Sequence, residues 1–177
     1  MGDRVYVTFA IRGRIETVEA LDVICESIVE HGLGDLSDYT AMRDADEAKA
    51  VISAALTEGE ASVIFYDDQC NYADLSALEA TCKEHGVAYQ FEWEAGGEFD
   101  AGSSAFSPEQ GEATEYQNDA LGADIIRLLE LPDAEAIAAI RKRVAAADLA
   151  RNESRLPKLS ASDAVQAHLR EWEAEDA

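Results

Sequence analysis

Residues 91–100, FEWEAGGEFD, constrain the fold of this chain most strongly because they predict a β-hairpin and its loop length. In a hairpin, directly opposed residues share one face of the sheet. A three-residue loop at 95–97 separates acids from aromatic residues and puts Gly97 where a left-handed backbone is needed. The acidic pairs that then face each other are Glu94 with Glu98 and Glu92 with Asp100.

This hairpin predicts a tetrad of carboxylates on one sheet face. Like charges that oppose each other directly are destabilising, by up to about 1 kcal/mol each. No lysine or arginine lies between Lys83 and Arg127 to relieve them. We therefore expect a partner to bind this surface, and the predicted partner-binding residues are the tetrad and three acids that follow it, Glu92, Glu94, Glu98, Asp100, Glu109, Glu112 and Glu115.

The charge of the chain is large and uneven. The formal net charge is −23 over 177 residues, with −8 in residues 1–60, −13 in 61–130 and −2 in 131–177. Such a charge disfavours direct binding to nucleic acid or to an anionic membrane, because both depend on Lys and Arg. The concentration in the middle third favours an acidic patch over a uniform acidic surface.

The cysteines and the hydropathy pattern indicate the compartment. Three cysteines, an odd number without C-x-x-C spacing, favour reduced thiols and a cytoplasmic location. No apolar run approaches the length of a membrane-spanning helix, and the chain opens on an alternating strand.

Strands and helices alternate through the first 107 residues. Period-two patterns predict strands at 4–12, 61–66 and 87–93, followed by the return strand of the hairpin. Apolar stripes at helical spacing predict helices from Thr17 to about 31, from Asp44 to about 58 and from about 74 to 85. The order β-α-α-β-α-β-β predicts an α/β fold of the α+β kind. We expect a mixed four-stranded sheet with three parallel strands, with helices mainly on one face and the other face partly open.

The rest of the chain is predicted as a linker and a helical appendage. Residues 1–107 form the α/β domain, 108–119 an acidic loop, and 120–177 the appendage. Its three helices have apolar stripes formed by Leu121, Ile125, Leu128 and Leu129, then Ile137, Ile140 and Val144, then Val165, Leu169 and Trp172. We expect the appendage to pack on the α/β domain or to form a homodimer surface.

Segments of residues 60–107 resemble small phage and mobile-element proteins, in which a tyrosine-bearing turn precedes a Leu-Glu helix and a strand. The matching segments are FYDD at 65–68, YADL at 72–75, LEA at 78–80 and HGVAY at 85–89. The resemblance provides no functional residues. It implies a setting in which acidic proteins act as DNA mimics, as anti-restriction and anti-CRISPR inhibitors do.

We therefore expect a non-enzymatic inhibitor that mimics nucleic acid and occupies the basic groove of a nucleic-acid-binding protein or complex. Proteins hold DNA in grooves lined with Lys and Arg, which a row of carboxylates can also fill. Two alternatives stay open. One is a generic acidic surface of the halophile type, in a ligand-binding or protein-interaction domain. The other is a divalent cation held by opposed strand carboxylates, although no EF-hand loop is present.

Other chemistries find less support in the sequence. No cofactor motif and no catalytic constellation is evident, and Cys25 and Cys82 belong to apolar helix stripes. Cys70, Cys82 and His85 could form a transition-metal site, but Cys82 is more typical of a core position. A small anionic ligand could bind the open sheet face through Arg4, Tyr6, Arg12 and Arg14, unless these arginines pair with the surplus acids.

Overall fold

A computed structural model describes residues 4–35, 40–71, 73–97, 100–109, 114–117, 132–151 and 155–175. Its strands are β1 (Arg4–Arg12), β2 (Arg14–Ile15), β3 (Gly34–Asp35), β4 (Thr40–Ala41), β5 (Val63–Asn71), β6 (Ala88–Trp93), β7 (Gly102–Phe106), β8 (Thr114–Gln117) and β9 (Ser160–Ala161). Its helices are α1 (Val18–Glu30), α2 (Ala45–Glu58), α3 (Ser76–Glu84), α5 (Asp133–Arg151) and α6 (Asp163–Glu175). The mixed α/β character expected from the sequence is confirmed.

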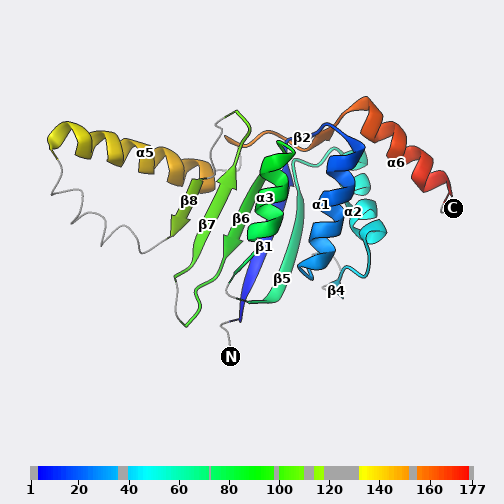
Figure 1. Cartoon of the computed structure of the whole chain (residues 1–177), viewed down its shortest axis with the longest axis horizontal. Helices are drawn as coiled ribbons and strands as arrows, with labels where there is room; N and C mark the ends of the chain where they lie inside the picture. Colours follow the sequence, from blue (N-terminus) through cyan, green and yellow to red (C-terminus); the bar gives the residue numbers. More distant parts are fainter. Residues whose placement is uncertain are drawn as a thin grey trace.

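The main sheet has seven strands in the order β4-β3-β5-β1-β6-β7-β8, and every neighbouring pair is antiparallel (Figure 1). The predicted four-stranded sheet with three parallel strands is therefore wrong. Two helices, not one, connect β1 to β5, so the chain returns to the end where β1 stopped and β5 must run back along it. Strands β5 and β6 are parallel to each other, but β1 lies between them.

Helices α1, α2 and α3 cover one face of this sheet, as expected (Figure 1). Val7, Phe9 and Ile11 alternate along β1 and are fully buried beneath the helices. The Phe9 ring stacks on Tyr89 of β6, with 5.1 Å between ring centroids. The opposite face is partly open along β1, where Tyr6, Thr8 and Ala10 are half-buried.

The predicted helix starts of α1 and α2 are confirmed by their capping hydrogen bonds. The Thr17 hydroxyl accepts from the backbone N–H of Ala20 at 3.1 Å, and the Asp44 carboxylate accepts from that of Glu47 at 3.0 Å. These bonds satisfy donors that a helix start leaves free. The Glu47 carboxylate in turn accepts from the N–H of Arg43, one residue before the cap.

Helix α6 packs on the α/β part of the chain, as expected for the appendage. Val165 and Leu169 are buried in the common core, and β9 pairs in parallel with β2. Lys49 of α2 bridges to Asp22 of α1 at 2.9 Å, and its Nζ lies 5.8 Å from the Trp172 ring centroid. An ion pair and a cation–π contact thus join α1, α2 and α6.

The second half of the chain departs from the predicted loop and helical appendage. Residues 114–117, predicted as part of a loop, form the edge strand β8. Helix α5 exists, but its stripe of Ile137, Ile140 and Val144 is exposed rather than buried. The predicted helix with Leu121, Ile125, Leu128 and Leu129 lies outside the described residues. The division into three domains stays a prediction.

Candidate functional site

The hairpin forms in a different register from the predicted one. Strand β6 pairs with β7 so that Trp93 opposes Gly102 and Glu92 opposes Ser103. Residues 94–101 therefore connect the strands, and the predicted tetrad, with Glu92 facing Asp100, is wrong. The actual β7 sequence, GSSAF, consists mostly of small residues and is buried along its whole length. Phe106 stacks on Tyr89 with 5.9 Å between centroids, which helps to fix this register.

The seven predicted partner-binding acids do not form one patch. Glu92, Glu94 and Asp100 are exposed at the end of the sheet where β6 stops and β7 begins. Glu109 is exposed but follows the far end of β7. Glu115 aligns with Ser104, one position away from the cross-strand row of Glu92 and Ser103. The remaining two, Glu98 and Glu112, lie outside the described residues.

Two acids that sequence reasoning missed lie at the same end of the sheet as Glu92. Asp67 opposes Val7 of β1, and Val7 opposes Trp93 of β6 on its other side. Asp68 follows at the bulge where the β1–β5 register shifts between Val5 and Val7. We call Asp67, Asp68, Glu92, Glu94 and Asp100 the acidic end. All are exposed except Asp67, which is half-buried.

Two hydrogen bonds to backbone carbonyls hold the acidic end together. The N–H of Glu94 donates to the carbonyl of Tyr6 at 3.0 Å, which extends the β6–β1 contact beyond the last strand residue. The Trp93 indole Nε1 donates to the carbonyl of Asp100 at 3.0 Å. Strands lie about 4.8 Å apart, so the backbones of β5 and β6 are about 10 Å apart, with β1 between them. Asp67 shares the sheet face of Val7 and Trp93, whereas Glu92 lies in the row of Thr8 on the other face.

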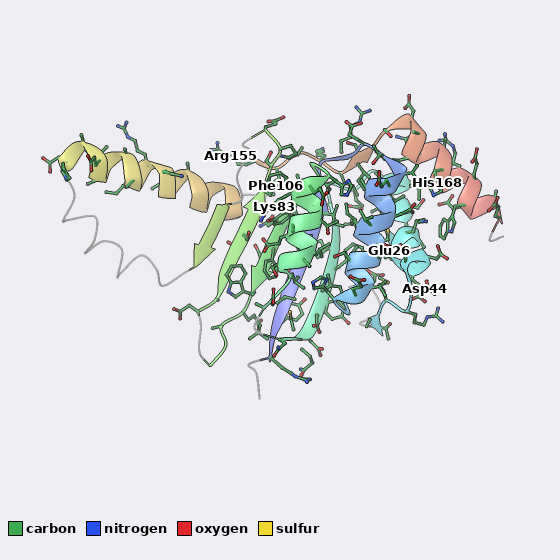
Figure 2. All side chains as sticks on the ribbon, in the orientation of Figure 1. Glu26, Asp44, Lys83, Phe106, Arg155 and His168 are labelled. Atoms are coloured by element: carbon green, nitrogen blue, oxygen red, sulfur yellow. The ribbon has the colours of Figure 1, made fainter. Side chains whose placement is uncertain are left out.

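Basic side chains are few at this end. Within the described strands β1, β5, β6 and β7, the bases are Arg4, exposed at the acidic end, and Arg12, buried at the opposite end. Lys83 and Arg155 also lie toward that opposite end, where β7 finishes at Phe106 (Figure 2). The sheet is therefore electrically asymmetric along its strands, and its negative end is exposed to solvent.

Asp74 follows β5 and organises the start of α3. Its carboxylate accepts from the Ser76 hydroxyl at 2.7 Å and from the Ser76 backbone N–H at 3.1 Å. These hydrogen bonds favour the ionised form and lower the pKa of Asp74 below its usual value. Asp74 thus forms a turn with Ser76, the first residue of α3, one position before the N-cap Leu75.

Replacing Asp74 with alanine should destabilise the fold at neutral pH by about 0.5–1 kcal/mol, because its exposed carboxylate loses two hydrogen bonds from Ser76. Because the pKa of Asp74 is lowered by folding, its contribution is present above the usual aspartate pKa and is lost as the pH falls through the folded-state value. Urea unfolding at pH 7 and at about pH 3 measures this difference. Asp74→Asn, which keeps an acceptor, is the matched control. An equal loss of stability for Asp74→Ala at both pH values would contradict a role for the ionised carboxylate in this turn.

A buried polar contact joins α3 to the sheet. The Tyr89 hydroxyl donates to the Glu79 carboxylate at 2.7 Å, and the Ser104 hydroxyl donates to the same oxygen at 2.8 Å. Burial, followed by the hydrogen bond to Glu79, raises the pKa of Tyr89, so its hydroxyl stays protonated. These three residues position α3 over β6 and β7.

The three cysteines are free and buried. Burial raises the pKa of Cys25 to about 12, of Cys70 to about 11 and of Cys82 to about 12. Since the thiolate is the reactive form, these groups are poor nucleophiles and poor metal ligands at neutral pH. The expected core positions of Cys25 and Cys82 are confirmed.

A thiol reagent such as DTNB should therefore leave the native chain unmodified at pH 8 over minutes. In denaturant it should modify all three cysteines. The variant Ala54→Cys, which adds a thiol at an exposed position of α2, serves as a positive control and should react at once. Rapid modification of one cysteine in the unmodified native sequence would contradict the burial described here.

The arginines proposed for a small anionic ligand do not gather on one open face. Arg12 is only 3% exposed, while Arg14 lies in β2 and pairs with Glu16 at 3.3 Å. Within the described ranges, no group of three or more His, Cys, Asp or Glu side chains is placed to hold a metal ion. None of the helices in the described part of the chain is both long and apolar enough to cross a membrane.

In comparisons with known proteins, no family model, curated protein or solved structure matches this chain. The resemblance to phage and mobile-element proteins stays a prediction.

Proposed function

We propose that this chain is a non-enzymatic acidic inhibitor that mimics nucleic acid and blocks a nucleic-acid-binding protein or complex. The observation that supports this most is the acidic end, where acids from β5, β6 and the β6–β7 connection lie at the same end of the sheet. About 10 Å of duplex axis carries about six phosphate charges. Five carboxylates gathered at one end of the sheet can therefore compete for part of the groove that holds such a stretch of duplex.

The partner that fits this surface is a protein with a groove lined by Lys and Arg. Tyr6 and Trp93 are half-buried beside the acids, and the Trp93 ring lies 5.0 Å from Phe91 between centroids. Aromatic faces next to carboxylates suit arginine, whose guanidinium stacks on rings and forms paired hydrogen bonds with carboxylates. The free cysteines fit a cytoplasmic site of action.

Capture from a cell lysate on the tagged chain tests this proposal, at about 50 mM and about 500 mM salt and with or without excess duplex DNA. Because competition for a basic groove is electrostatic, the captured protein should be lost at high salt and in the presence of DNA. A specific partner that DNA does not displace would instead indicate a conventional protein-binding surface.

A second function class, a generic acidic domain of the halophile type, is favoured by one further observation. Exposed acids also lie on the helices, among them Glu19, Glu26, Asp46, Glu58 and Glu171. Such a protein is stabilised when salt screens the repulsion between its acids. A melting temperature that climbs continuously with molar KCl, together with no partner captured, would favour this class over mimicry.

A further inference from the structure

The open face of the sheet carries a pair of tyrosine rings at its acidic end. Tyr6 and Thr8 of β1 are half-buried on this face, whereas Val7 between them is fully buried under the helices. The Tyr6 ring lies 6.1 Å from the Tyr66 ring of β5 between centroids. Because Tyr66 is only 6% exposed, the accessible ring of the pair is that of Tyr6.

Two carboxylates of β6 lie on the same face as the Tyr6 ring. Glu92 opposes Thr8, and its carboxylate accepts from the side-chain amide of Gln90 at 3.0 Å. Glu94 continues this register opposite Tyr6, where its backbone N–H donates to the Tyr6 carbonyl at 3.0 Å. Directly opposed residues of antiparallel strands have Cβ atoms about 4.5–5.5 Å apart. A group that stacks on the Tyr6 ring is therefore within reach of the Glu94 carboxylate.

The charges around the Tyr6 ring favour a cation as its ligand. Among the described residues of this end, Asp68, Glu92 and Glu94 are exposed acids and Arg4 is an exposed base on the same face, which leaves three negative charges against one positive. A guanidinium is planar, stacks on aromatic rings and forms paired hydrogen bonds with a carboxylate. An ammonium is a point charge and cannot form the paired bonds. The surface therefore suits arginine better than lysine.

We propose that the open face at Tyr6, Glu92 and Glu94 is an arginine-binding surface, and that its ligand is an arginine side chain of the partner protein. The guanidinium stacks on the Tyr6 ring and donates paired hydrogen bonds to the carboxylate of Glu94 or Glu92. The identification of the partner as a protein with a basic groove rests on the proposed function. The preference for a guanidinium rests on the ring and the carboxylates beside it.

Fluorescence anisotropy of labelled oligo-arginine and oligo-lysine peptides of equal length tests the proposal at about 100 mM salt. The unmodified chain should bind the arginine peptide about two- to fivefold more tightly than the lysine peptide. Tyr6→Leu removes the ring and should bring the two affinities together, whereas Tyr6→Phe keeps a ring and should keep the preference. Trp172→Leu, which removes a half-buried aromatic residue of α6, is the matched control and should also keep it. Equal binding of the two peptides by the unmodified chain, or an unchanged preference in Tyr6→Leu, would overturn the proposal.

A second pair of variants, Glu94→Gln and Glu58→Gln, stays informative if Tyr6→Leu destabilises the fold, because each removes one exposed acid. Glu94→Gln should weaken binding of the arginine peptide more than Glu58→Gln, which changes the last residue of α2. Equal weakening would overturn the proposal, since binding would then depend on total charge. Failure of the inhibitor function has a different signature. Lysate capture would then yield no protein that DNA displaces, although the arginine preference would still depend on Tyr6.

Discussion

Replacing Phe9 with alanine should lower the free energy of unfolding by about 3–5 kcal/mol, the usual cost of removing a buried aromatic ring. Phe9 is fully buried in β1, the central strand of the sheet, and its ring contacts Tyr89 at 5.1 Å and Phe91 at 6.1 Å between centroids. The cavity would open where the sheet meets the helices. Since domains are stable by only about 5–15 kcal/mol, this variant can lose most of its folded population.

Urea unfolding measures this loss in the free energy of unfolding. Two further variants serve as comparisons. Phe9→Leu retains most of the volume and should cost less than Phe9→Ala. Thr8→Ala changes the adjacent residue, which is half-buried on the opposite face, and should cost under about 1 kcal/mol. A loss for Phe9→Ala no larger than that for Thr8→Ala would contradict the central position of β1.

Neutralising the acidic end should weaken partner binding by about tenfold or more at low salt, because several exposed charges of up to about 1 kcal/mol each are lost together. The variant combines Asp67→Asn, Asp68→Asn, Glu92→Gln and Glu94→Gln. The shapes are preserved, and an asparagine side-chain oxygen at position 67 can still accept from the N–H of Gln69, as the Asp67 carboxylate does at 2.8 Å. Quantitative capture at fixed low salt measures the loss.

The matched control removes four exposed acids elsewhere, with Glu19→Gln, Glu58→Gln, Glu60→Gln and Glu84→Gln. Glu60 shortly precedes the start of β5, and Glu84 shortly precedes the start of β6, so these two belong to the opposite end of the sheet. Both variants carry a net charge of −19 instead of −23. If the acidic-end variant and the control variant weaken partner binding equally, binding depends on the total charge of the chain and not on the acidic end.

Local features of this fold were predictable from the sequence. The alternation of Val5, Val7, Phe9 and Ile11 identified β1 and its buried face, and Thr17 and Asp44 identified the starts of α1 and α2. Strand alternation and capping depend on neighbouring residues, so the sequence contains the whole signal. The inner stripes of α1 and α6 were found in the same way.

Strand pairing was less predictable because it depends on the path of the whole chain. The two helices between β1 and β5 reverse the direction of β5, and β1 then separates β5 from β6. The true partner of β6, the segment GSSAF, has few strand-forming side chains, so the acidic FEWEAGGEFD pattern looked more like a complete hairpin. The register was therefore wrong by several residues.

The candidate site was half predictable for a related reason. Glu92, Glu94 and Asp100 were identified from local charge, but the strand predicted at 61–66 stopped before Asp67 and Asp68. They join the site because β5 continues past them through a bulge to Asn71. For α5, periodicity correctly identified an apolar face, but it does not indicate whether the same chain covers that face.

The central claim is that this protein and nucleic acid exclude each other from one basic groove. The most direct measurement uses the partner purified from the capture experiment, bound to a fluorescently labelled duplex and titrated with this chain while anisotropy is followed. The account predicts that the unmodified chain releases the duplex at a stoichiometric ratio, that the control variant does so equally, and that the acidic-end variant does not. A stable ternary complex, with the duplex still bound at saturating chain, would contradict it.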